Sequence, residues 1–403
     1  MKRKRRISFG TIIIPDAAIE LAMTALKSGR VSSGQLVHKF ERRFADLLGA
    51  KHAVAVGTGT DADTLALAVL YDYGARRGDE VIVPALSFVA TGNAVLHAGF
   101  TPVFVDIDRS TLNIDSDGIE KCITERTIAI MPVHLMGKPA NMKKIMNIAR
   151  KHKLQVVEDA AEAHGGTYNG KTLGTIGGMG AFSTYVAHIV TTIEGGVIVT
   201  DNDAYAEILR SLRSHGRACK CESCLLNVTG GYCKKRFANK ELGDRRFIFE
   251  RVGYSSKMNE IEAAVGLGNL GNFHDILSKR RRNLIALIKG IAGFKPYLAT
   301  IKEDRGEKIG PHALPVIVSE DAPFSRDDIV DYLEKQGVDT RSLFQSMPTQ
   351  CPGFAFLGYR HGDFPNAEFM GTNGFHIGVH HGLNDEDISY VLECFDEFIG
   401  KYR

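Results

Sequence analysis

The chain has 403 residues, 44% of them hydrophobic and 24% charged, and its formal net charge is +3. This composition is typical of a globular protein of about two domains, and the charge excludes a nucleic-acid-binding surface that covers the whole chain. No segment approaches the ~18 apolar residues of a membrane span, and no apolar signal-peptide segment follows the basic residues 2–6. We therefore expect a cytoplasmic protein that binds neither nucleic acid nor membranes.

Helix and strand patterns alternate over residues 15–265. In chain order they predict helices at 14–29 and 38–49, a strand at 52–57, a helix at 61–74, a strand at 79–84, a helix at 90–99, strands at 101–108 and 127–137, a helix at 141–154 and a strand at 155–161. This alternation predicts an α/β fold with a mostly parallel central sheet that helices cover on both faces.

The pattern changes near residue 270. A long helix at 273–291, a strand at 312–319 and helices at 325–338 and 385–400 predict a smaller α+β unit. We therefore divide the chain into a large domain at 1–268, with a cysteine-rich insertion at 217–236, and a small C-terminal domain at 269–403.

Candidate ligand-binding residues follow the ends of predicted strands, where α/β sheets bind their ligands. Gly59 and Thr60 open a helix, so their backbone N–H groups can cradle a phosphate, although such glycines also form simple tight turns. Asp159 can hold a protonated ring nitrogen or cap the next helix. Phe88 can stack on a flat ligand or belong to the core. Ser183 can add a hydroxyl to the phosphate site.

Four of the seven cysteines lie close together in the sequence. Cys219, Cys221, Cys224 and Cys233 fall within fifteen residues, in the order C-x-C-x2-C-x8-C. In a cytosolic protein this spacing favours a metal site over disulfides. Four thiolates can hold either Zn²⁺ or an iron–sulfur cluster.

Together these segments resemble the DegT/DnrJ/EryC1/StrS sugar aminotransferase family of fold-type I pyridoxal-phosphate enzymes, over essentially the whole chain. The segments that carry the resemblance are GTGTDA (57–62), PALSF (84–88), TPVFVDID (101–108), EDAAEAHGG (158–166), LRSHGR (212–217), GYSSKMNEIEAAVG (253–266), GVDTR (337–341) and the loop from Phe182 to Gly196. The resemblance implies that Gly59, Thr60 and Ser183 bind the cofactor phosphate, that Phe88 stacks on its ring, that Asp159 pairs with its ring nitrogen and that Glu162 contacts its ring hydroxyl.

His188 is the main departure from the aminotransferase pattern, because it stands where most family members have the lysine that forms a Schiff base with PLP. Imidazole cannot hold the cofactor in this way, but it can act as a general base near neutral pH. A subset of the family with histidine here consists of PMP- or PLP-dependent 3-dehydratases of nucleotide-linked 4-keto-6-deoxyhexoses. The resemblance therefore implies that His188 removes a proton from the cofactor methylene while the C3 hydroxyl leaves.

The cysteines resemble those of the iron–sulfur members of this subset. Cys219, Cys221 and Cys233 match three family ligands, and Cys224 replaces a fourth that the family carries upstream, where this chain has Ala160 and Ala161. The expected cofactors are therefore PMP/PLP and a [2Fe–2S] or [4Fe–4S] cluster, with zinc as the alternative. Such a cluster implies a one-electron reductase or ferredoxin as partner.

Several further expectations rest on the resemblance. The family builds its sites at a dimer interface, which implies a homodimer. Ser255 takes the place of an asparagine that the neighbouring subunit places near the phosphate. His215 and Arg341 are candidates for contact with the nucleotide-linked sugar, or else surface residues. Two alternative functions stay open: a cluster-containing PMP enzyme for another keto or amino sugar, and a non-catalytic zinc-binding regulator.

Overall fold

A computed structural model describes residues 5–222, 224–226, 231–238 and 243–403. Its central sheet has seven strands in the order β1-β9-β8-β5-β4-β2-β3. The strands are β1 (His52–Val56), β2 (Glu80–Pro84), β3 (Thr101–Val105), β4 (Thr127–Ile130), β5 (Gln155–Asp159), β8 (Met179–Ser183) and β9 (Gly196–Thr200). Only β9 runs antiparallel to its neighbours, so the predicted mostly parallel α/β sheet is confirmed.

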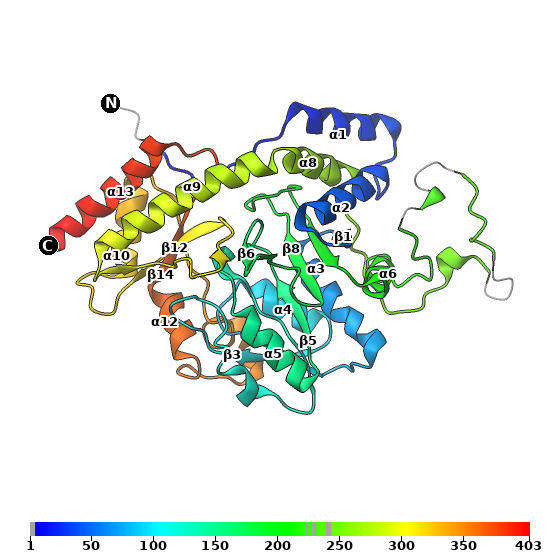
Figure 1. Ribbon diagram of the computed structural model, residues 1–403, viewed down its shortest axis with the longest axis horizontal. Coiled ribbons are helices and arrows are strands. Elements are labelled where there is room, and N and C mark those ends of the chain that lie inside the picture. The colour runs from blue at the N-terminus through cyan, green and yellow to red at the C-terminus, as the bar shows by residue number, and fades with distance from the viewer. Residues whose placement is uncertain (1–4, 223, 227–230, 239–242) are drawn as a thin grey trace.

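Helices pack around this sheet because most of its strands are buried along their length and need cover on both faces. These helices are α1 (Asp16–Ser28), α2 (Gln35–Leu48), α3 (Gly59–Ala68), α4 (Val89–His97), α5 (Met142–His152), α6 (Asp203–Leu212) and α8 (Glu260–Gly271). The described parts of residues 217–250 extend to one side of the sheet, beyond α6 (Figure 1).

A second sheet lies in the C-terminal part of the chain and has the order β10-β12-β14-β13. Its strands are β10 (Leu298–Ala299), β12 (Ala313–Val318), β13 (Thr340–Ser342) and β14 (Gly374–Gly378). The helices of this part are α9 (Phe273–Ile291), α10 (Arg326–Lys335), α11 (Met347–Gln350), α12 (Pro365–Asn373) and α13 (Asp385–Ile399). Figure 1 shows α9 running from α8 to α10 and α13, so this helix connects the two parts. The division of the chain at residue 268 stays a prediction.

Short elements complete the fold. A three-stranded sheet consists of β6 (Thr167–Tyr168), β7 (Lys171–Thr172) and β11 (Glu307–Lys308). Short 3₁₀ helices are η1 (Val69–Tyr73), η2 (Ile119–Cys122), η3 (Leu135–Gly137), η4 (Arg245–Phe247), η5 (Ala292–Phe294), η6 (Pro352–Leu357) and η7 (Gly400–Tyr402). Among the described residues, no helix is long and apolar enough to cross a bilayer.

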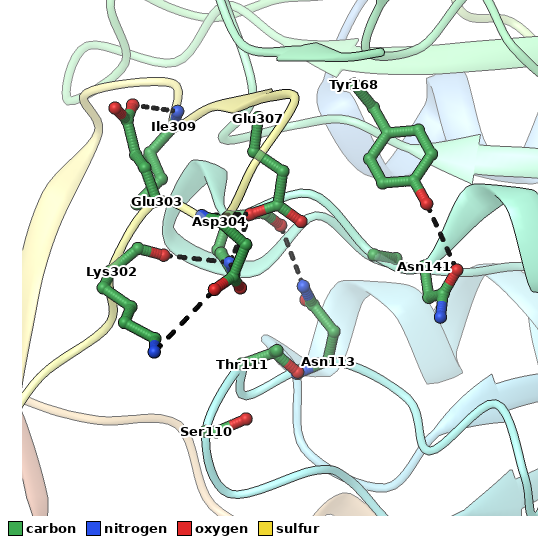
Figure 2. A network of polar contacts seen from close by, with 12 residues as sticks. Ser110, Thr111, Asn113, Asn141, Tyr168, Lys302, Glu303, Asp304, Glu307 and Ile309 are labelled. Atoms are coloured by element: carbon green, nitrogen blue, oxygen red, sulfur yellow. Dashed lines mark hydrogen bonds and ion pairs between the residues drawn. The ribbon is translucent and has the colours of Figure 1, made fainter.

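A buried lysine connects the loop after β4 to the segment before β12. Lys138 is fully buried, and its Nζ donates hydrogen bonds to the carbonyl of Lys302 (2.9 Å) and to Asp304 (2.8 Å) and pairs with Glu307. Figure 2 shows this polar network, with Asp304 and Glu307 close together. Beside it, the N–H of Gly310 donates to the carbonyl of Gly137 (2.9 Å). These contacts fix the start of β12 against the edge of the central sheet.

Candidate active site

The carboxyl ends of the central strands surround a cavity of about 450 Å³. Parallel strands deliver the residues that follow them to one edge of the sheet, which is why segments far apart in the sequence meet here. The lining consists of Thr58, Gly59, Thr60, Asp63, Ser87, Phe88, Ala90, Thr91, Val133, Leu135, Asp159, Ala161, Glu162, Ser183, Tyr185, Ala187, His188, Glu194, His312 and Phe344. All the predicted catalytic residues, and every predicted cofactor-binding residue except Ser255, belong to this set.

One end of the cavity is suited to a phosphate. Helix α3 begins here at Gly59, and the Thr58 side chain caps it by accepting a hydrogen bond from the N–H of Asp61 (3.0 Å). The free N–H groups of a helix start attract anions. A Cβ on Gly59 would lie only 2.7 Å from Cβ of Ser183, so glycine is needed for the helix start to approach the serine. This cradle fits the phosphate of a pyridoxal-type cofactor.

Asp159 lies at the end of β5 with 5% of its surface exposed. The Thr91 hydroxyl donates a hydrogen bond to Asp159 Oδ2 (2.7 Å), and the N–H of Ala161 donates to Oδ1 (3.2 Å). Burial nevertheless raises the pKa of Asp159, because desolvation outweighs these bonds. A buried carboxylate of this kind favours a cationic partner, and a protonated pyridine nitrogen fits that requirement.

Glu162 lies one turn further along the same segment. Its Oε2 accepts a hydrogen bond from the N–H of Met136 (2.6 Å), and its Oε1 lies 3.5 Å from Nε2 of His312. Burial raises the pKa of Glu162 to about 8, and the charge of Asp159 adds to the shift. Glu162 is therefore protonated near neutral pH and can donate a hydrogen bond to an oxygen in the cavity.

His188 lies in the loop between β8 and β9. Its ring centroid is 4.9 Å from that of His312 and 6.3 Å from that of His164, and its Nδ1 has no hydrogen-bond partner among the described residues. Burial lowers the pKa of His188 to about 3, and the buried Arg280 adds to the shift. This value lies below the near-neutral one expected from the sequence. The imidazole is therefore neutral at physiological pH, so its ring carries an unprotonated nitrogen, although burial also makes it a weaker base than an exposed histidine.

Phe88 lines the cavity and is also exposed to solvent. It lies at the N-terminus of α4, is 56% exposed, and its ring centroid lies 5.5 Å from that of Phe344. A phenyl ring left this exposed on a cavity wall can stack on a planar ligand.

Three predicted residues lie outside the lining of this cavity. Ser255 is exposed and forms an isolated bridge with Ser214. His215 is exposed and has a positive φ of 65°. Arg341 is exposed, donates to the carbonyl of Thr340 (2.7 Å) and lies over the ring of Phe9 (5.2 Å). The roles predicted for these three residues stay predictions.

The four clustered cysteines surround a different hollow, of about 190 Å³. Cys219, Cys221, Cys224 and Cys233 are free thiols and share its lining with Lys220, Lys235, Arg236, Arg245 and Arg246. Among the described residues, no group of three or more histidine, cysteine or acidic side chains has the placement of a metal site. The donor set suits a metal or cluster, but the thiols do not form a ligand shell.

Among the cavity residues that sequence reasoning missed are Asp63, Thr91 and His312. Asp63 is a charged residue within the buried stretch Ala62–Ala68 of α3, and a charge among alanines and leucines is a signal that could have identified it. Thr91 and His312 carry no such signal, because their position depends on how distant segments pack together.

Comparison with known proteins gives a consistent result. The chain matches the DegT/DnrJ/EryC1/StrS aminotransferase family over residues 13–396. It is 35% identical to dTDP-4-dehydro-2,6-dideoxy-D-glucose 3-dehydratase of Saccharopolyspora spinosa over 410 aligned residues, which cover 97% of this chain and 86% of that protein.

Two solved structures are similar over nearly their whole length. An E. coli GDP-4-keto-6-deoxy-D-mannose-3-dehydratase with bound hydrated PLP has a TM-score of 0.85 and 29% identity, covering 97% of this chain and 100% of the other. An aminotransferase from Psychrobacter cryohalolentis has a TM-score of 0.86 and 30% identity, covering 98% and 99%. The predicted family resemblance and the fold-type I aminotransferase-like architecture are confirmed.

Proposed function

The chain belongs to the DegT/DnrJ/EryC1/StrS aminotransferase family, and we propose that within it this protein is a PMP-dependent 3-dehydratase of a nucleotide-linked 4-keto-6-deoxyhexose. The observation that carries the proposal is His188, a neutral imidazole in the cavity whose described lining contains no lysine. Without a lysine amine in this described lining, the cavity offers no group for a Schiff base, and the cofactor would bind without a covalent bond to the protein. The names of the dehydratase relatives support the same substrate class.

The cavity residues have separate tasks in this reaction. The start of α3 at Gly59 and Thr60, with Ser183, holds the cofactor phosphate. Asp159 keeps the ring nitrogen protonated, and Phe88 covers one face of the ring. When bound, the cofactor supplies an electron sink through which the bond between C3 and its hydroxyl can break.

His188 would take part in proton transfer, and Glu162 would act as a hydrogen-bond donor. The neutral imidazole of His188 would accept a proton from the cofactor methylene carbon C4′. The protonated carboxyl of Glu162 would donate a hydrogen bond to the cofactor ring hydroxyl.

A substitution of His188 tests this proposal. We expect His188→Asn to keep PMP binding but to lower dehydration by about 100-fold or more, the usual contribution of a general base. Loss of C3 oxygen from CDP-, dTDP-, UDP- and GDP-linked 4-keto-6-deoxyhexoses is measured by mass spectrometry, together with exchange of the C4′ proton into deuterated solvent. His361→Asn, at an exposed histidine, is the control. Unchanged turnover or exchange in His188→Asn would contradict the proposal.

We further propose that the four clustered cysteines hold an iron–sulfur cluster, with zinc as the alternative. The support is that four free thiols line one hollow whose rim carries five lysine and arginine side chains, which would balance the negative charge of a thiolate-bound cluster. Such a cluster transfers single electrons, which implies a one-electron reductase or ferredoxin as partner.

Metal analysis tests this second proposal. After anaerobic reconstitution we expect iron and acid-labile sulfide in the protein, a broad visible absorption, and loss of both in Cys224→Ser but not in the control Cys351→Ser. A colourless protein that binds only zinc would contradict the proposed cluster.

The expected homodimer is tested by sedimentation on the same samples, where a monomer would contradict the expectation.

A further inference from the structure

Asp63 is a buried carboxyl in the cofactor cavity, and none of the roles proposed above involves it. Its side chain lines the same cavity as Asp159, only 2% of the residue is exposed, and its Oδ1 has no hydrogen-bond partner among the described residues. A buried carboxylate oxygen without a partner is costly and rare in folded proteins. Its presence in a cavity indicates that the partner arrives with the ligand.

The position of Asp63 on α3 indicates which part of the ligand it meets. Asp63 follows Gly59 by four residues, so it lies on the same face of the helix one turn beyond the phosphate cradle. In pyridoxamine phosphate, one ring carbon separates the carbon that bears the phosphate arm from the ring nitrogen. If the phosphate lies at Gly59 and the ring nitrogen at Asp159, the edge of the ring between the phosphate-bearing carbon and the nitrogen faces α3.

The charges in the cavity point to a cation. Burial raises the pKa of Asp63 well above its ordinary value, and the charge of Asp159 raises it further. Two neighbouring carboxyls whose charges repel each other would both be stabilised by a positive charge between them. The protonated pyridine nitrogen is the cation that the proposed cofactor brings.

We propose that Asp63 is a second cofactor-binding carboxyl, which acts together with Asp159 on the protonated ring nitrogen. The inference rests on the proposed use of PMP. Two carboxyls would bind the protonated pyridine ring more tightly than a single aspartate does. The ring would then be a stronger electron sink.

The isosteric variant Asp63→Asn tests the inference through cofactor binding. Dissociation constants of PMP, and of an analogue with carbon in place of the ring nitrogen, are measured on cofactor-free protein by equilibrium dialysis. We expect PMP to bind about tenfold more weakly to the variant, a change of about 1.4 kcal/mol, while the analogue changes less than about twofold. The neighbouring Thr64→Val, whose hydroxyl bonds only to the carbonyl of Thr60 among the described residues, is the control.

A second measurement separates binding from a structural role. Because Asp63→Asn removes a buried, repelled carboxyl, we expect the cofactor-free variant to melt at the same temperature as the wild type or higher. A lower melting temperature of Asp63→Asn, or an equal loss of affinity for PMP and for its carbon analogue, would overturn the inference. Asp63→Ser repeats the comparison with a smaller side chain. If wild-type protein fails to bind PMP, the proposed function falls as well; if wild type binds and Asp63→Asn binds equally well, only this inference falls.

Discussion

Electrostatics at single residues shape the chemistry of this cavity. Three buried carboxyls, Asp63, Asp159 and Glu162, have raised pKa values, while the pKa of His188 is lowered. Burial is the largest cause in each case, because it penalises whichever form carries charge. Burial therefore makes charge costly at each of these side chains, and a bound group of opposite charge would offset that cost.

Glu162 gives a prediction for pH dependence. Its pKa in the folded protein is about 8, against an ordinary value of 4.5, so the folded state holds the proton more tightly than the unfolded state. The stabilisation from this group is complete below about pH 4.5 and is lost as the pH rises to about 8. Glu162→Gln has no such titrating group and so does not lose this stabilisation. The free energy of unfolding of the variant minus that of the wild type should therefore increase by about 2–4 kcal/mol between pH 4.5 and pH 8.5.

Urea unfolding of cofactor-free protein across this pH range measures the difference. Glu20→Gln, at an exposed carboxyl on α1, is the control and should follow the wild type. Parallel stability curves for Glu162→Gln and wild type would contradict the assignment of a raised pKa to Glu162.

The structure brings together the site residues that the sequence predicts at strand ends. Gly59, Phe88, Asp159, Ser183 and His188 each follow a short apolar strand or lie in a motif of the family, and the structure brings all of them to one cavity. Their exact roles stay predictions. The place of His312 in the cavity had no such marker, because His312 reaches His188 through the packing of distant segments.

At the scale of elements, the start of α3 is the most constrained feature of the site. Gly59→Ala would bring a methyl group within 2.7 Å of Cβ of Ser183. We expect a stability loss of about 1–3 kcal/mol from this overpacking, and PMP affinity at least tenfold lower because the phosphate cradle is displaced. Gly271→Ala, in α8, where a Cβ meets no atom within 4 Å, is the control and should bind PMP normally. Normal PMP binding by Gly59→Ala would show that the phosphate lies elsewhere.

Most elements could be predicted from their hydrophobic periodicity, as the agreement of the predicted helix at 273–291 with α9 (Phe273–Ile291) shows. The predicted strand at 127–137 was too long, since β4 ends at Ile130 and residues 135–137 form a 3₁₀ turn. The apolar residues there are buried as a loop, and Pro132 cannot donate a ladder hydrogen bond. Apolar content alone does not separate a buried strand from a buried loop.

At the scale of the whole molecule, the two sheets depend on contacts that sequence patterns do not reveal. The N-terminal residue Ile7 bridges to Val338 beside the second sheet, and Arg5 pairs with Asp387 on α13. Lys138 likewise connects the loop after β4 to residues 302–307. Contacts between residues so far apart in the sequence arise only when complete elements pack together. The sequence patterns that predicted a boundary at residue 268 therefore could not predict these contacts.

Lys138 gives a prediction at this scale. Lys138→Met leaves Asp304 and Glu307 facing each other without their shared cation, so we expect a loss of about 3 kcal/mol in the free energy of unfolding. Lys279→Met, which removes an exposed pair with Asp275 in α9, is the control and should cost less than about 0.5 kcal/mol. Equal stability of the two variants in urea unfolding would contradict the role of Lys138 at this junction.

The claim that the cofactor is held without a covalent bond can be tested by borohydride reduction of the protein loaded with PLP, followed by intact mass spectrometry. Because His188 replaces the Schiff-base lysine, the wild-type chain should keep its unmodified mass while the cofactor is recovered from the solution as its reduced alcohol, pyridoxine phosphate. His188→Lys should gain one reduced cofactor per chain, which shows that the reduction works. A reduced adduct on a lysine of the wild-type chain would contradict the account.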